Sequence, residues 1–117
     1  MRALVRTAHG VYEVDLEEEE VLGLADDTGF AARVAVRDGE TMVVATEETH
    51  PPLRVSYDGG ETWTDAGAGL PAARALAIDG DVVLYAGRNR LFLSEDGGRF
   101  WRALAPELPE IEAVALG

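Results

Sequence analysis

Cysteine is absent from this sequence of 117 residues. No disulfide can therefore stabilise the fold, and no thiolate can bind a metal ion or attack a substrate. Long apolar runs are absent as well, because no stretch approaches the roughly 20 residues that a membrane-spanning helix needs. The first residues, Met1–Arg6, become polar too early for a signal peptide, so we expect a cytoplasmic protein.

Positive charge is scarce, since ten basic side chains stand against 22 acidic ones and the formal net charge is -12. Such a surface repels phosphate backbones and anionic lipids, so we expect neither nucleic acid nor membrane as a partner. The charge favours solubility first, and a basic protein partner is the alternative interpretation. In the same way, the run Glu17–Glu20 is expected to form a solvated acidic hairpin, with a docking patch as the alternative.

One segment of the sequence occurs twice. Residues 54–63 align with residues 92–101, and the alignment continues without a gap until residues 75–78 match residues 113–116. A third, weaker copy opens the chain, where residues 10–14 resemble residues 90–94. A period near 40 residues with short strands is typical of the blades of a β-propeller.

The repeat predicts an all-β fold of three four-stranded antiparallel blades, which is half of a propeller. We expect a single domain over residues 1–117, with repeats near 1–37, 38–78 and 79–116. The inner strands are expected near 32–37, 73–78 and 111–116, the second near 2–7, 41–46 and 82–86, the third near 10–15, 53–57 and 91–95, and the outer near 21–25, 62–66 and 100–104.

Both strong copies share a pattern of serine, aspartate, glycine and tryptophan at fixed spacing. The first copy has Ser56, Asp58, Gly60, Thr62 and Trp63, and the second has Ser94, Asp96, Gly98 and Trp101, with Phe100 in place of threonine. This pattern resembles the Asp-box, or BNR repeat, of sialidase-like and other β-propellers. The resemblance implies that these turns lie on the outer rim, away from the central site.

The chemistry of the pattern favours a structural role. An aspartate at position 58 can accept hydrogen bonds from nearby backbone N–H groups, and Gly60 can supply the positive φ of a tight turn. Trp63 offers a large apolar surface for burial between neighbouring sheets. Calcium prefers six to eight oxygen ligands and this turn offers one carboxylate, so we expect neither a metal ion nor another cofactor.

The inner strands of a propeller line its central axis, where ligands bind. Their aligned leading positions are Arg33, Arg74 and Glu112, which are candidates for a central anion site. The alternative is a solvated ring of charges that neutralise one another. The two histidines, His9 and His50, lie in corresponding loops of different blades and are poorly placed to share a metal ion. The sialidase resemblance would imply an arginine triad, a Tyr/Glu pair and an acid, and we find no such complete set.

Two functions from different classes remain. The first is a non-catalytic protein-binding or assembly module, similar to the propellers that assist photosystem assembly. The alternative is a glycan-binding or sialidase-like protein related to glycoside hydrolases, as the family resemblance implies. Fold analogy alone cannot choose between them, because one fold supports many functions.

The order of the strands also predicts an assembly. The chain opens with a second strand near 2–7 and closes with an inner strand near 111–116, so its two ends are expected to pair. Closed propellers have about four to eight blades, and we expect three blades to be too few for pairing within one chain. We therefore expect a homodimer in which each last strand completes the first blade of the other copy. The alternatives are a piece of a longer propeller or an open three-blade stack.

Overall fold

The computed structural model describes residues 1–47 and 50–117, which contain twelve strands and no helix. The strands are β1 (Arg2–Thr7), β2 (Gly10–Asp15), β3 (Glu20–Ala25), β4 (Ala35–Asp38), β5 (Thr41–Ala45), β6 (Leu53–Ser56), β7 (Thr64–Ala66), β8 (Ala75–Asp79), β9 (Val82–Ala86), β10 (Arg90–Ser94), β11 (Arg102–Glu107) and β12 (Ile111–Leu116). Within these described residues, no helix is long and apolar enough to span a bilayer.

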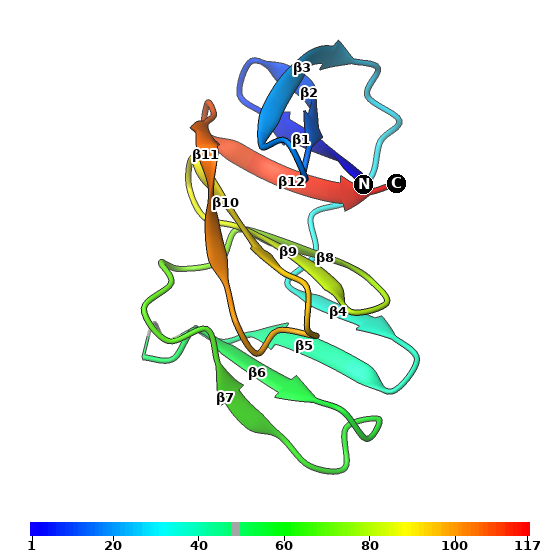
Figure 1. Ribbon diagram of the computed structural model, residues 1–117, viewed down its shortest axis with the longest axis vertical. Helices are drawn as coiled ribbons and strands as arrows, with labels where there is room; N and C mark the ends of the chain where they lie inside the picture. The colour runs from blue at the N-terminus through cyan, green and yellow to red at the C-terminus, as the bar shows by residue number, and fades with distance from the viewer. Residues whose placement is uncertain (48–49) are drawn as a thin grey trace.

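The strands form three four-stranded antiparallel sheets (Figure 1). We call them blade 1 (β12, β1, β2 and β3), blade 2 (β4 to β7) and blade 3 (β8 to β11), in the order in which the strands are hydrogen-bonded. The predicted all-β architecture of three four-stranded blades is confirmed. The predicted strands are all present, but several begin later than expected. The inner strands β4 and β8 begin three and two residues later, at Ala35 and Ala75, and the outer strands β7 and β11 begin two residues later, at Thr64 and Arg102. The N–H groups of Thr62 and Phe100 are instead bound by the aspartates of the preceding turns.

The pairing of the two chain ends differs from the prediction. Strand β12 pairs with β1 of the same chain, with Val114 opposite Val5 and Leu116 opposite Ala3. The expectation that this strand would complete a blade of another copy is therefore wrong for the pairing itself. The physical reason is the linker of residues 26–34, which lets blade 1 lie beyond blade 3, so that the ends meet without a closed ring.

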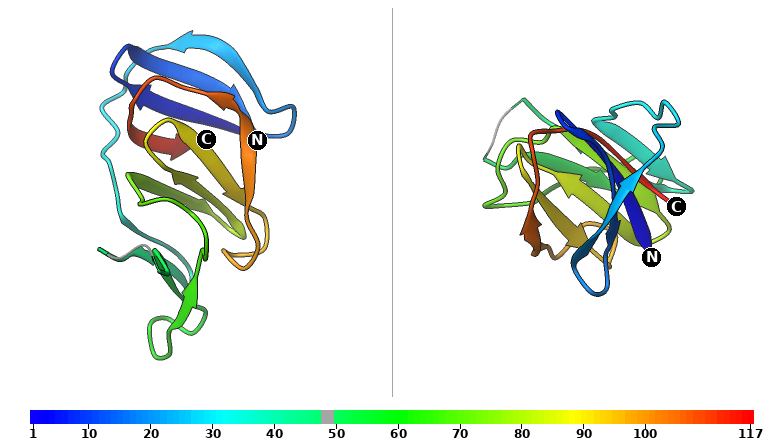
Figure 2. Two further views of the ribbon diagram at one scale, coloured as in Figure 1. Left: turned by 90° about the vertical axis from the view of Figure 1, so that its left-hand side faces the viewer. Right: turned by 90° about the horizontal axis from the view of Figure 1, so that it is seen from above.

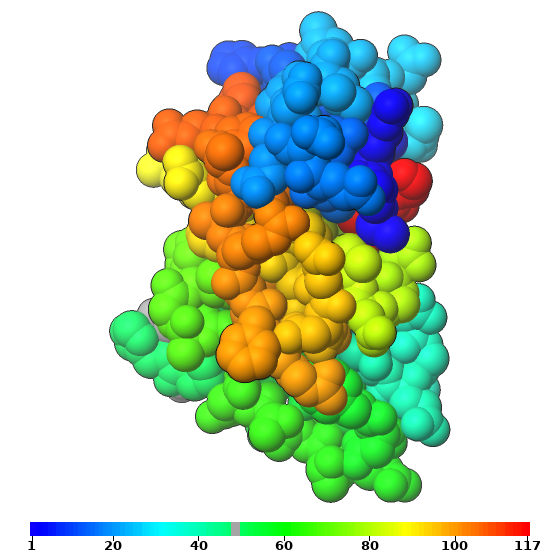
Figure 3. Space-filling model, viewed as in Figure 1, coloured from blue at the N-terminus to red at the C-terminus, as the bar shows by residue number. Residues whose placement is uncertain are grey.

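Blade 3 occupies the middle of the molecule, which measures 40 × 26 × 25 Å. Its inner strand β8 contacts both β12 of blade 1 and β4 of blade 2. The linker of residues 26–34 therefore passes blade 3 on its way from blade 1 to blade 2 (Figure 2). On another face, the β10–β11 segment extends from blade 1 to blade 2 (Figure 3). The Tyr57 hydroxyl of blade 2 donates a hydrogen bond to the carbonyl of Gly97 in that segment.

Two apolar cores hold the blades together, one on each side of blade 3. The first joins blades 1 and 3 and includes Val5, Val14 and Leu84, all fully buried. The second joins blades 2 and 3 and centres on Tyr85, which packs with buried Val43 and Val55. Because side chains alternate between the two faces of a strand, Leu84 and its neighbour reach different cores. Blade 3 is thus buried on both faces.

Candidate functional site

The first repeated turn is organised by the side chain of Asp58. Its Oδ1 accepts hydrogen bonds from the Ser56 hydroxyl at 2.8 Å and from the Thr62 N–H at 2.9 Å. The Thr62 hydroxyl donates to Oδ2, and the N–H of Gly60 donates to the Ser56 oxygen. The Trp63 indole N–H donates to the Gly60 carbonyl at 3.0 Å. These donors, chiefly the Thr62 hydroxyl, lower the pKa of Asp58 to about 2.

The second turn repeats this arrangement without the threonine. Asp96 accepts hydrogen bonds from the Ser94 hydroxyl at 2.7 Å and from the N–H groups of Arg99 and Phe100 at 3.0 Å each. The Phe100 N–H is the main reason why the pKa of Asp96 is lowered. The Arg99 N–H thus supplies a donor where threonine supplies its hydroxyl in the first turn. Both glycines have the positive φ that such turns need, 96° at Gly60 and 97° at Gly98.

Both carboxylates are therefore engaged by the backbone of their own turns. A carboxylate that already accepts two or three hydrogen bonds has few lone pairs left for a metal ion. Among the residues that the structure describes, no group of three or more histidine, aspartate or glutamate side chains is arranged to hold a metal ion. The geometry of the turns thus fits a structural role.

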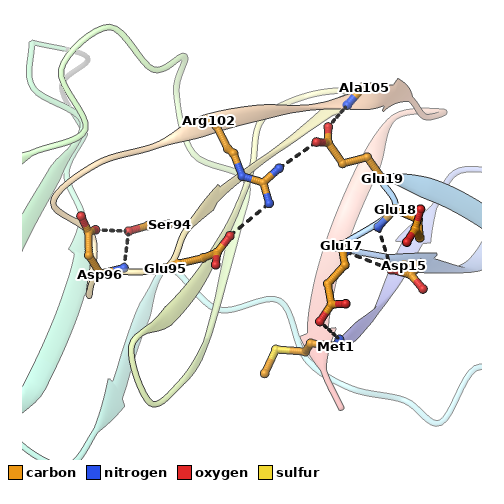
Figure 4. A network of polar contacts seen from close by, with 10 residues as sticks. All are labelled: Met1, Asp15, Glu17, Glu18, Glu19, Ser94, Glu95, Asp96, Arg102 and Ala105. Carbon is orange, nitrogen blue, oxygen red and sulfur yellow. Dashed lines mark hydrogen bonds and ion pairs between the residues drawn. The ribbon is translucent and has the colours of Figure 1, made fainter.

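The acidic hairpin between β2 and β3 is also hydrogen-bonded to itself (Figure 4). Asp15 accepts the N–H groups of Glu17 and Glu18 at 2.9 and 3.0 Å, and the Glu18 N–H is the main cause of its lowered pKa. The Glu17 carboxylate lies 3.5 Å from the amino group of Met1 and is mostly exposed. These two glutamates remain at the surface, and their docking to a basic partner stays a prediction.

Glu19 has a different role from its acidic neighbours. Its Oε2 accepts a hydrogen bond from Arg102 at 2.8 Å, and its Oε1 accepts the N–H of Ala105 at 2.8 Å (Figure 4). Arg102 also donates to Glu95. The backbone of Glu19 has a φ of 54°, which is uncommon for a residue with a side chain. This glutamate therefore ties blade 1 to the outer strand of blade 3.

The three candidates for a central anion site do not converge. Arg33 is exposed, and its carbonyl accepts the N–H of Leu76 in β8 at 2.7 Å. Arg74 donates to Glu110 at 3.0 Å and is thus neutralised locally. Glu112 lies on β12 and is exposed. The pKa of Arg6 is raised chiefly by its bond to Asp27, with a smaller contribution from the charge of Glu112. Of these three residues, Arg33 is the one that lines the groove described in the next paragraph.

A groove runs along the inner strands and has a volume of about 600 Å³. Its walls come from the linker, including Phe30, and from strands β4, β5, β8 and β12. Two of the residues that line it are charged, Arg33 and Arg37, and the others are apolar. Arg37 donates one hydrogen bond to the carbonyl of Gly39 at 2.8 Å. The groove thus combines an apolar surface with two guanidinium groups in an otherwise acidic protein.

Arg6 fixes the first half of the linker to blade 1. Its guanidinium binds both carboxylate oxygens of Asp27, at 2.6 and 2.8 Å, and donates to the carbonyl of Phe30 at 2.7 Å. It also lies 4.4 Å from the centre of the Phe30 ring, within the range of a cation–π contact. The bond to Arg6 is the main cause of the lowered pKa of Asp27, which is about 2. The linker wall of the groove is therefore held in place.

Sequence reasoning missed Arg37 and Arg6, although the repeat contains a signal for both. Arg37 of blade 2 occupies the position that Ile78 occupies in blade 3. In the same way, Arg6 of blade 1 occupies the position of Ala86 in blade 3. A charged residue at a position that is apolar in the other copy indicates a local difference in the environment. The groove itself depends on the path of the linker, which has no counterpart in the repeat.

Comparison with protein families agrees with this architecture. Residues 1–111 match the family model Gmad1, described as the lipoprotein LpqB β-propeller domain. The chain belongs to the LpqB β-propeller domain family. No curated protein matches the chain.

The match to the LpqB β-propeller domain covers β1 to β11 in full and ends at Ile111, the first residue of β12. The family therefore supports a propeller for all three blades. The groove lies against the inner strands, which line the axis of a propeller. In this member of the LpqB domain family, Arg33 and Arg37 are the charged residues of the groove, and a ligand for Arg33 stays a prediction.

Proposed function

We propose that this LpqB-type propeller domain is a non-catalytic module of the Asp-box type that binds a protein partner. The Asp-box assignment is supported by the hydrogen bonds of both turns, where Asp58 and Asp96 each bind the serine hydroxyl and backbone N–H groups. The same bonds direct these two carboxylates to folding rather than to catalysis. Hydrolysis of a glycoside commonly needs two carboxyl groups that flank the scissile bond. Among the residues that the structure describes, no carboxylate lines the groove.

The observation that carries the proposal is the composition of the groove. An apolar surface with a few well-placed polar groups is typical of binding sites. Arg33 and Arg37 add donors that suit a carboxylate. A protein segment with apolar side chains and one acidic group or terminal carboxylate fits this chemistry best. The net charge of -12 disfavours a strongly acidic partner at long range, so the acidic group must be local.

Affinity capture with two matched variants tests the proposal. Arg33→Glu reverses the charge in the groove, while Arg88→Glu reverses a similarly exposed charge outside it. Wild-type protein and Arg88→Glu should retain the same partner, identified by mass spectrometry and then titrated in purified form. Arg33→Glu should raise the Kd for that partner at least tenfold.

Two outcomes would contradict the proposed function. Hydrolysis of a fluorogenic sialoside, or specific binding on a glycan array that Arg33→Glu abolishes, would favour the glycan-active alternative. Partner binding that Arg33→Glu leaves unchanged would remove the groove from the function.

A further inference from the structure

The two interfaces between blades follow one rule. Each blade has a front face, which in blade 3 carries Leu76 and Tyr85, and a back face, which in blade 3 carries Ala77 and Leu84. The front face of blade 3 packs on the back face of blade 2, and the back face of blade 3 packs on the front face of blade 1. Every contact between blades is therefore front on back.

One front face and one back face remain uncovered at the two ends of the stack. On the front face of blade 2, Ala35 and Arg54 are exposed, and Met42 and Val44 are half-buried. The strand registers place Val44 opposite Ala35 and Arg54, just as Tyr85 stands opposite Leu76 and Phe92 in blade 3. The positions that blade 3 buries against its neighbour thus have no neighbour in blade 2.

The back face of blade 1 is the complementary half. Leu4 stands between Ala115 and Glu13, in the place that fully buried Leu84 takes between Ala77 and Leu93 in blade 3. Leu4, Glu13 and Ala115 are all only half-buried.

The linker already covers the adjoining part of this back face. Phe30 lies against Arg6 there, and Leu70 of the blade 2–blade 3 linker packs in the corresponding core. A linker side chain thus covers the edge of the back face in blade 1 as well as in blade 2. The back face of blade 1 differs in that no front face of another blade packs on it.

We propose that a second copy of the chain supplies the missing faces. The back face of blade 1 in one copy packs on the front face of blade 2 in the other, and a two-fold axis repeats the contact. Six blades then form a closed ring, which lies within the range of about four to eight blades found in propellers. The two faces also match in chemistry, because Leu4 and Glu13 would meet Met42, Val44 and Arg54.

Each copy keeps its own β12 in this ring. The strand is already paired with β1 along its length in the single chain, from Ile111 to Leu116, with one irregularity between Arg6 and Thr7. Association therefore needs no exchange of strands, in contrast to the dimer expected from the sequence. The ring would also cover part of the groove, because Ala35, Met42 and Val44 line the groove and belong to the front face of blade 2. Arg33 precedes β4 and is not one of these paired face residues.

Light scattering on a sizing column tests the ring. The wild-type protein should give twice the 12.5 kDa of one chain. Val44→Glu and Leu4→Glu place a carboxylate on each face in turn, and both should give the mass of one chain. Phe100→Glu is the matched control, because Phe100 is 80% exposed in the outer turn of blade 3, and it should remain a dimer. Circular dichroism verifies that each variant is folded.

A wild-type protein that stays a monomer at the highest soluble concentration would overturn the proposal. Retention of the dimer in both folded face variants would overturn it as well. The mass of Arg33→Glu is measured beside its partner binding. A dimer that has lost the partner supports both proposals, whereas a dimer that still binds the partner contradicts the proposed function alone, so the two failures are distinguishable.

A designed disulfide tests whether β12 stays in its own copy. Ala3 and Leu116 are cross-strand neighbours, and the chain has no other cysteine. After complete oxidation, Ala3→Cys/Leu116→Cys should run as a single chain on a non-reducing denaturing gel, while the native protein still has the mass of a dimer. A covalent dimer on the gel would mean that the strand is exchanged, which contradicts this part of the proposal.

Discussion

Tyr85 offers the sharpest test of how blades 2 and 3 are joined. Its side chain is fully buried and its hydroxyl donates to the carbonyl of Pro71. The ring makes edge-to-face contacts with Phe92 and Trp101, at centroid distances of 5.9 and 5.7 Å. The substitutions Tyr85→Phe and Tyr85→Ala therefore separate the hydrogen bond from the packing.

The two variants should differ clearly in the free energy of unfolding. Tyr85→Phe loses one hydrogen bond, and because Pro71 is exposed and its carbonyl can bind water instead, the loss should be about 1 kcal/mol. Tyr85→Ala removes the whole ring from a filled core and should cost about 3–5 kcal/mol. Phe100→Ala, at a side chain that is 80% exposed, should change stability by less than about 0.5 kcal/mol.

Urea unfolding followed by circular dichroism, at one fixed protein concentration, measures these differences. If Tyr85→Ala were no more destabilising than Phe100→Ala, Tyr85 would not centre the core between blades 2 and 3. The same residue predicts an alkaline limit, because burial raises the pKa of Tyr85 to about 12 from an ordinary value of 10.0. A raised pKa contributes stability below pH 10 that is lost as the pH rises towards 12, and Tyr85→Phe should flatten this loss.

Three further perturbations have defined outcomes. The pKa of Asp58 in the folded protein is about 2, against an ordinary 3.8, so this carboxylate stabilises the fold above pH 4 and loses that effect as the pH falls to 2. The free energy of unfolding of Asp58→Ala, measured over this pH range, should lack the loss. A pH profile like that of the wild type would contradict the role of the turn. Trp101→Ala should lower the free energy of unfolding by about 3 kcal/mol. Trp63→Ala should cost less at low protein concentration and approach that value at a concentration where a second copy covers blade 2. Denaturation at two protein concentrations measures the difference. Glu19→Gln should cost less than about 1 kcal/mol. Glu19→Ala should cost more in thermal melts, because only glutamine can still accept the N–H of Ala105; equal melting temperatures of the two variants would mean that this bond does not stabilise the contact between blades 1 and 3.

The sequence predicted the strands because their signals are local. Asp38-Gly39 and Asp79-Gly80 mark turns between paired strands. Alternating apolar residues, such as Leu53 and Val55 of β6, identify the faces. The repeat then identifies which strands correspond between blades. Since each blade buries its side chains only against a neighbour, the periodic pattern alone predicts a stack of blades.

The sequence did not predict the order of the blades. A repeat describes what each blade contacts on its two faces, but it does not state which copy provides the contact. Arg6 and Asp27 hold the start of the linker on blade 1, and the bond between Arg33 and Leu76 holds its end on blade 3. These contacts join one repeat to another or involve a residue that differs between the copies, such as Arg6, so periodicity contains no information about them.

The same reasoning explains why the predicted anion site separated while the predicted turns formed. A turn needs bonds over a few residues, as between Ser94 and Asp96, and such bonds depend only on the local sequence. Arg33 and Arg74 are equivalent in the alignment, but Arg74 has Glu110 within 3.0 Å and Arg33 faces the groove instead. Equivalent positions in a repeat therefore share a fold but need not share a chemical environment. A residue that departs from its copies, such as Arg37 in place of Ile78, is consequently the better guide to such a local difference.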